Sequence, residues 1–189
     1  MPFARRVASL LILLGSSFAA RALTSEDYEV YSVVLDGFST HTGNPQIALA
    51  SDLLNPASVK PSPGACGAPP IAGVPARTGD AERLDERKLR LSRPYKLLTK
   101  EEVAQWSAKR FLPQVHTDPP GPEPPDPYPG SHDLVQLSGI VYSADHNTAA
   151  VYVSDTCGTL CGIWGWAIIQ KSRDRSWRML SSLGCATIA

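Results

Sequence analysis

The sequence lacks an excess of charge of either sign, and it lacks a second long apolar run. Its 189 residues carry 18 Lys and Arg against 18 Asp and Glu. Because no basic field is present to attract a phosphate backbone, nucleic acid is not expected as a partner. A permanent transmembrane helix needs about 20 apolar residues, and no segment after residue 22 meets that requirement.

Motifs for common chemistry are missing as well. The chain has no G-x-G-x-x-G or Walker pattern for phosphates and no G-x-S-x-G nucleophile elbow. It also has no C-x-x-C pair and no H-x-x-x-H partner that would suit zinc. The sequence therefore predicts no cofactor, no metal ion and no catalytic residue.

The first 22 residues have the layout of a secretory signal peptide. Arg5 and Arg6 precede the apolar stretch 7–14, and small residues follow up to Ala22. The apolar stretch is too short for a stable membrane anchor, so cleavage after Ala22 is favoured over an uncleaved anchor. We expect an exported protein, secreted or periplasmic, in which 23–189 form a single α+β domain with a net charge of about −3.

All four cysteines lie in the part expected to be exported: Cys66, Cys157, Cys161 and Cys185. An even number in an oxidising compartment favours disulfides, and three connectivities remain open. Cys157 and Cys161 are expected opposite each other across a three-residue turn, within reach of a disulfide. That link would stabilise by only about 2 kcal/mol, whereas a link between Cys66 and Cys185 would stabilise by about 5 kcal/mol because it closes a longer loop. A metal site and a redox centre are the alternatives.

Local signals predict helices and one strand before the proline-rich part. Thr24 or Ser25 begins a helix that ends near Gly37. Thr99 and Glu102 form a capping box that opens a helix to about residue 110, docked through Trp106. A short exposed helix is expected over 80–91, and a short strand over 46–53.

Two segments are rich in proline, 56–79 and 113–130. The first predicts an extended surface loop, with Cys66 as a tether. The second predicts polyproline II of about 3.1 Å per residue, long enough to cross one face of a small domain. A docking site for proline-recognition modules is the alternative for the second segment.

The last third of the chain predicts an antiparallel meander of about four strands, over 134–142, 149–154, 164–171 and 177–182. Side chains alternate within these segments. We expect Val135, Leu137 and Val141 on one face, and Trp164 on the face opposite Ala167. Both faces are apolar, so we expect two or three helices on one face and proline-rich chain over part of the other, which gives an α+β fold.

The four histidines, His41, His116, His132 and His146, all lie in polar or turn-like stretches. The simplest interpretation is that they are surface loop residues. His132 with Asp133, or His146 with Asp145, would be the candidates for a hydrolase. Trp164, Trp166 and Trp177 are expected in the core, with a ligand groove as the alternative.

Several stretches resemble a set of small exported bacterial proteins of uncharacterised function. They are the helix 28–35, the segment 95–99 before the second helix, 137–139 with 149–153, and 157–162 followed by Lys171 and Trp177. The resemblance implies export and a helix-plus-sheet fold, and it brings no catalytic residues. The long proline-rich insert and the Gly184-Cys185 ending depart from the pattern.

From these observations we expect a non-enzymatic, disulfide-stabilised domain that binds a partner, either a protein or an envelope component. The first alternative is an extracytoplasmic hydrolase with a site centred on a histidine. The second is a structural or accessory envelope protein whose proline-rich arm spaces other components.

Overall fold

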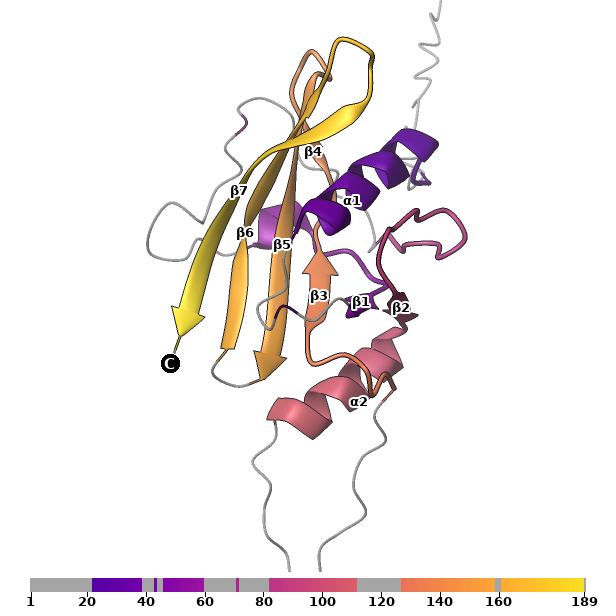
Figure 1. Cartoon of the computed structure of the whole chain (residues 1–189), viewed down its shortest axis with the longest axis vertical. Coiled ribbons are helices and arrows are strands. Elements are labelled where there is room, and N and C mark those ends of the chain that lie inside the picture. The colour runs from indigo at the N-terminus through magenta and orange to yellow at the C-terminus, as the bar shows by residue number, and fades with distance from the viewer. Residues whose placement is uncertain are drawn as a thin grey trace, which may run out of the picture.

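The protein is an α+β fold built on one mixed seven-stranded sheet (Figure 1). The computed structural model describes residues 22–38, 43, 46–59, 71, 82–111, 127–158 and 161–188. The elements in chain order are α1 (Ser25–Gly37), β1 (Ile47–Ala50), the 3-10 helix η1 (Pro56–Ser58), β2 (Tyr95–Leu98), α2 (Lys100–Phe111), β3 (Leu134–Leu137), β4 (Val141–Tyr142), β5 (Thr148–Gly158), β6 (Cys161–Lys171) and β7 (Trp177–Ile188).

The sheet has a parallel part and an antiparallel part. The strand order is β2-β1-β3-β5-β6-β7, and the short β4 also pairs with β5. β1 runs parallel to both β2 and β3. From β3 through β5 and β6 to β7 every pairing is antiparallel. The predicted C-terminal meander is confirmed, but it is only part of a larger sheet.

Both helices begin at a threonine that closes a capping box. The Thr24 side chain accepts from the Asp27 N–H, and the Asp27 carboxylate accepts from the Thr24 N–H. Thr99 and Glu102 exchange the same two bonds at the start of α2. These bonds satisfy N–H groups that a helix leaves unpaired, so both helices start close to the predicted positions.

The two helices cover opposite faces of the sheet. Side chains alternate along a strand, and in β1 Ile47 and Leu49 pack in the cluster with α1. Ala48 and Ala50 pack instead against Trp106 of α2. The expectation of helices on one face is therefore wrong, because the small alanines of β1 leave room for the Trp106 ring on the second face.

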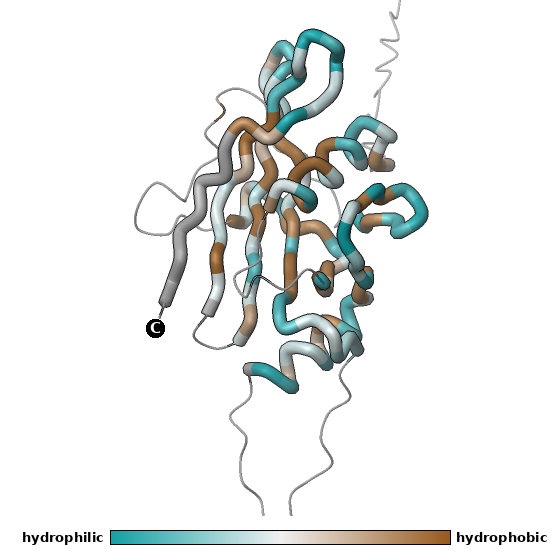
Figure 2. The backbone as a smooth tube through the Cα atoms, viewed as in Figure 1, coloured by the Kyte–Doolittle hydropathy of each residue, from teal (hydrophilic) through white to brown (hydrophobic). Residues whose placement is uncertain are grey.

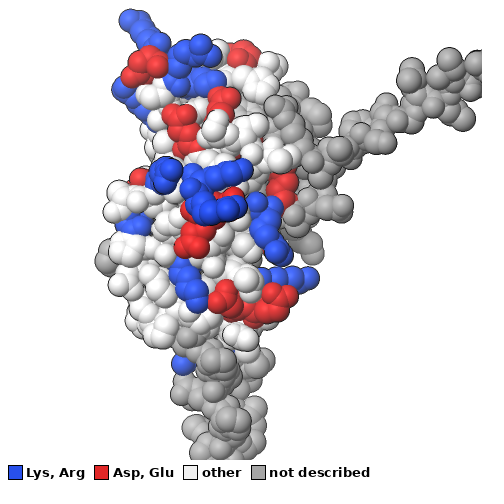
Figure 3. Space-filling view, turned by 90° about the vertical axis from the view of Figure 1, so that its right-hand side faces the viewer, with Lys and Arg blue, Asp and Glu red and all other residues white. Residues whose placement is uncertain are grey.

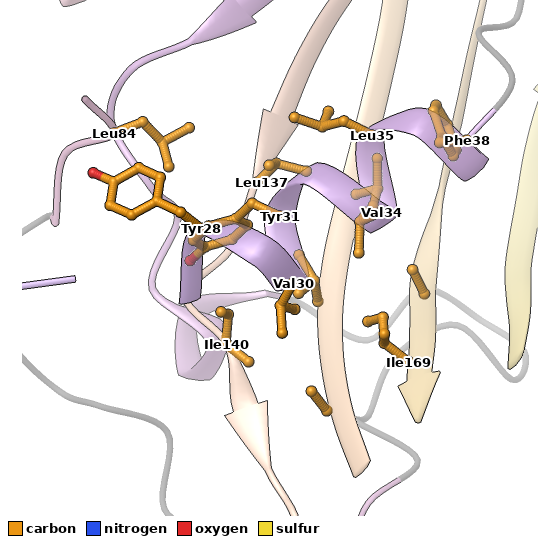
Figure 4. Packing of buried hydrophobic residues seen from close by; sticks show 14 of the residues in the cluster. Tyr28, Val30, Tyr31, Val34, Leu35, Phe38, Leu84, Leu137, Ile140 and Ile169 are labelled. Carbon is orange, nitrogen blue, oxygen red and sulfur yellow. The ribbon is translucent and has the colours of Figure 1, made fainter. Parts of the chain in front are cut away.

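The larger core lies between α1 and the sheet. Val30, Tyr31, Val34 and Leu35 point from α1 toward the strands, where Leu137 is among the residues they meet (Figure 4). The Tyr31 hydroxyl, fully buried, donates to the Ser138 carbonyl at 3.2 Å. Hydrophilic residues gather in the turns after β4 and after β6, away from this core (Figure 2).

The second face carries a smaller aromatic cluster around Trp166 and Tyr152. Their rings pack edge to face, with the ring centres 5.5 Å apart. Trp164 packs beside them, so the predicted opposition of Trp164 to Ala167 is confirmed. Val59 and Ile71 of the first proline-rich segment also pack here. Val141 lies in this cluster, not with Val135, because the chain between β3 and β4 breaks the alternation.

Two other local expectations are wrong. The residues from Glu82 to Leu91 form no helix: Arg83 makes a β-bridge with Asp52, and a turn follows. Leu84 and Leu89 are buried, which a five-residue spacing on one helix would not allow. Pro56, at the start of the expected extended loop, is buried in the 3-10 helix η1.

Several predicted features lie outside the described residues. They are nearly all of the predicted signal segment, most of 56–79 including Cys66, and 113–126 of the second proline-rich segment. Among the helices that the structure describes, none has both the length and the apolar character needed to cross a membrane.

Candidate functional site

A groove of about 1020 Å³ runs along the outer side of α1. We call it the α1 groove. Ser25, Glu29, Ser32, Val33 and Asp36 follow one another along its length. These positions share one side of the helix because residues three or four apart are neighbours on a helix surface. The side that faces the core is different, so α1 contributes to both the core and the groove.

One wall of the α1 groove is the connection before β2, held along α1 by hydrogen bonds. The Asp85 N–H donates to the Tyr28 hydroxyl at 2.9 Å. The Arg90 N–H donates to the Ser32 hydroxyl at 3.1 Å. The N–H of the following Ser92 donates to the Asp36 carboxylate at 2.9 Å. This wall is therefore fixed at three successive turns of α1.

The other wall is the start of β7. The Trp177 N–H donates to Glu29 at 3.4 Å, and Met179 lies against the end of α1. A Cβ added to Gly37 would lie 2.9 Å from the Met179 methyl carbon. The Met179 side chain thus packs closely against the end of α1.

The rim of the α1 groove is more basic than acidic. It carries Arg87, Lys88, Arg90 and Arg178 against Glu29 and Asp36. Figure 3 views the side on which the connection before β2 lies, and basic side chains gather across its middle with acidic ones among them. The basic side chains of this rim are candidate contacts for an anionic group.

The basic side chains differ in whether they already have a partner. Arg87 pairs with Asp85 at 2.9 Å and Arg178 with Asp174 at 3.6 Å. The bond from Arg87 is the main reason that the pKa of Asp85 lies below its usual value. Among the described residues, Lys88 and Arg90 have no ion-pair partner.

Lys88 and the side chains next to it in the groove combine charge with apolar surface. The Lys88 ammonium lies 5.3 Å from the centre of the Tyr28 ring. Burial raises the pKa of the Tyr28 phenol, which therefore stays neutral at physiological pH. Val33 and Met179 are only partly buried by the core. The groove thus presents two available cations beside apolar side chains.

The sequence candidates for catalysis do not converge. The His132 and His146 side chains are exposed, and neither has a hydrogen-bond partner among the described residues. The His146 ring stacks on Tyr142 at 5.1 Å. His41 and His116 lie outside the part of the chain that is described.

The polar groups beside these histidines are engaged in structure. Asp145 accepts bonds from Ser143 and Asn147 in the turn between β4 and β5. Ser131, fully buried, donates to the Asp133 carbonyl at 2.7 Å and accepts from the Ala48 N–H. These bonds join β1 to the chain before β3, so Ser131 has a structural role.

The cysteine turn differs in register from the prediction. Gly158, at a φ of 150°, pairs with Cys161, so Cys157 is displaced from the position directly opposite Cys161. A bulge between Thr156 and Gly158 causes the displacement. Cys157 is disulfide-bonded. The side chains of its three possible partners, Cys66, Cys161 and Cys185, are outside the description, and the connectivity stays a prediction.

The tryptophans are packing residues. Trp166 and Trp177 are both buried in clusters of the sheet, and Trp164 is packed against the second-face cluster. Among the described residues, no three His, Cys, Asp or Glu side chains gather as metal ligands would.

Comparison with known proteins adds no relative: no family model, no curated protein and no solved structure matches this chain. The α1 groove was also not predicted from the sequence. Its residues come from three distant segments, and the expected helix over 80–91 would have placed Lys88 and Arg90 on a solvated surface. One local signal exists for the side of the groove that α1 forms. Ser25, Glu29, Ser32 and Asp36 follow one another at helical spacing, which predicts a polar outer side of the helix.

Proposed function

We propose that this chain is a non-enzymatic, disulfide-stabilised domain, exported from the cytoplasm, that binds an acidic segment of a partner protein in the α1 groove. The observation that carries the proposal is the pair Lys88 and Arg90, two exposed cations that have no ion-pair partner within the described part of the chain and lie beside the apolar surface of Tyr28 and Val33.

The two acids of the groove already accept hydrogen bonds from its walls. Glu29 accepts from the Trp177 N–H, and Asp36 accepts from the N–H and the hydroxyl of Ser92. Both carboxylates therefore hold the walls in place. A partner's carboxylates would meet Lys88 and Arg90, and an apolar partner side chain would bury Val33 and Met179.

The dimensions favour a peptide segment over a small molecule. A helix rises about 1.5 Å per residue, so the 13 residues of α1 give the groove a length of about 20 Å. An extended chain of about six residues covers that length at about 3.3 Å per residue. The volume also lies at the upper end of small-molecule pockets, which span about 300–1,000 Å³.

Selection of peptides tests the proposal without knowledge of the partner. The expected mature protein, residues 23–189, is immobilised. A random dodecapeptide library on phage is then selected against it. We expect enrichment of Asp and Glu beside aliphatic or aromatic residues. Enrichment of basic peptides, or none above an unrelated protein, would contradict the proposal.

The double variant Lys88→Glu, Arg90→Glu locates the site. We expect the enriched peptides to lose at least about tenfold in affinity, since repulsion replaces two attractions. Lys100→Glu with Arg173→Glu is the matched control: it makes the same change in net charge at two exposed positions outside the groove. Equal losses in both double variants would place binding elsewhere.

A further inference from the structure

The two edges of the sheet differ in how they are protected. β2, at one edge, is four residues long and carries Lys96, which bonds to Glu102 and to the Pro127 carbonyl. β7, at the other edge, is 12 residues long. Short length and lysine are both devices that keep an edge from pairing with another chain. β2 has these devices, and most of β7 does not.

The contacts of β7 show which part of its outer edge has no partner strand among the described residues. At its start, the Trp177 N–H is taken by Glu29 of α1. The register with β6 then shifts, so that Met179 pairs with Ile169 and Ser181 with Ile168, which leaves Leu180 as the extra residue of a bulge. From Ser181 to Ile188 the pairing with β6 is continuous. Among the described residues, no strand pairs with the outer edge of this stretch.

The stretch 181–188 contains no charged residue and no proline. The only charged residue in β7 is Arg178. Leu180, just before the stretch, is 63% exposed and is the one large hydrophobic side chain that is exposed among those whose burial is described. An uncharged, uninterrupted edge beside an exposed leucine is a template for adding a strand.

We propose that the outer edge of β7 pairs, antiparallel, with β7 of a second copy of this chain. A two-fold axis through the middle of 181–188 uses the same edge on both copies and closes the assembly as a dimer. The neutral edge meets itself without like-charge contacts. The two Arg178 residues would lie about 40 Å apart at about 3.3 Å per residue, well beyond a screening length of about 8 Å.

A second copy fits this edge better than a foreign acidic strand. The cations suited to an acidic segment, Lys88 and Arg90, line the α1 groove and lie outside β7. The edge itself offers no charge by which to select such a segment. The pairing is therefore independent of the proposed function, and either proposal can fail alone.

Light scattering of full chain 23–189 during size-exclusion chromatography, over a range of concentrations, gives the test. We expect a dimer for the wild type and a dissociation constant at least about tenfold larger for Ser182→Lys, which places a charge on the edge. Ser182→Thr and Ala57→Lys are controls that should remain dimeric, because the first is neutral and the second adds the same charge at an exposed position outside β7. A monomeric wild type would overturn the proposal, as would a dimer that Ser182→Lys leaves unchanged or that only a reductant dissociates.

Hydrogen exchange provides a second test that needs no variant. In the wild type, protection of the backbone amides in 181–188 should rise with protein concentration. Protection that does not depend on concentration would mean that another part of the same chain covers this edge, or that the edge stays free. Either outcome would contradict pairing between copies, even if Ser182→Lys fails to fold.

Discussion

α1 and α2 begin with the same device, a threonine capping box, yet they join the fold differently. α1 packs a row of side chains against the sheet, among them Tyr31 and Leu35. α2 packs mainly through one fully buried residue, Trp106. The outer side of α1 is enclosed by a fixed wall on each flank, whereas Ala104 and Gln105 on α2 are exposed. A similar local start thus leads to different roles, because the role depends on what the rest of the chain places beside each helix.

The largest effect expected from this comparison is that of Trp106→Ala. Removing the one large anchor of α2 should lower the free energy of unfolding by about 3–5 kcal/mol. Amide exchange in 100–111 should rise more than in α1. Denaturant unfolding and hydrogen exchange measure the two effects, with exposed Gln105→Ala as the control. Unchanged protection of α2 would show that Trp106 is not its anchor.

The two sides of α1 should respond differently to truncation. Leu35→Ala should lower the free energy of unfolding by about 2–5 kcal/mol, because it leaves a cavity in the larger core. Val33→Ala, on the groove side, should lower it by about 1 kcal/mol or less. Denaturant unfolding of both variants checks this. Similar losses would mean that the groove side of α1 is also part of the core.

The two threonine caps are predicted to differ in how much they contribute to the free energy of unfolding, although their geometry is alike. Asp27 is buried and also accepts from the Tyr142 hydroxyl at 2.8 Å, so Thr24→Ala disturbs a buried network. We expect a loss of about 2 kcal/mol for Thr24→Ala and about 0.5–1 kcal/mol for Thr99→Ala. Thermal unfolding of both variants measures the difference, and equal losses would contradict it.

The smallest effect concerns Asp174, in the turn that leads into the β7 wall. Bonds from Ser172, and then from Ser176, lower the pKa of Asp174 to about 2. A carboxyl with a lowered pKa adds stability above its unfolded pKa of about 4 and loses it as the pH falls toward 2. The melting temperatures of wild type and Asp174→Asn should therefore converge as the pH falls from about 5 to 2. A gap that stays constant over this range would contradict the assignment.

Local chemistry predicted a good part of this fold. The threonines that begin the helices and the alternation that sets Trp164 opposite Ala167 act within a few residues, so one sequence displays them. The parallel pairing of Ile47–Ala50 with Tyr95–Leu98 joins segments more than 40 residues apart and left no local trace. Val141 was placed on the wrong face because the break after Leu137 shifts the alternation. The α1 groove was missed for the same reason as β2: it exists only once distant segments meet.

The most direct test of the account is to map where an acidic chain binds. Poly-L-glutamate is added to ¹⁵N-labelled 23–189, and amide chemical shifts are followed at low salt and at high salt. We predict shifts at Val33, Lys88 and Arg90 that shrink as salt increases, with little change in α2. Shifts confined to the turn at 172–176, or no shifts at low salt, would contradict the assignment of the α1 groove as the binding site.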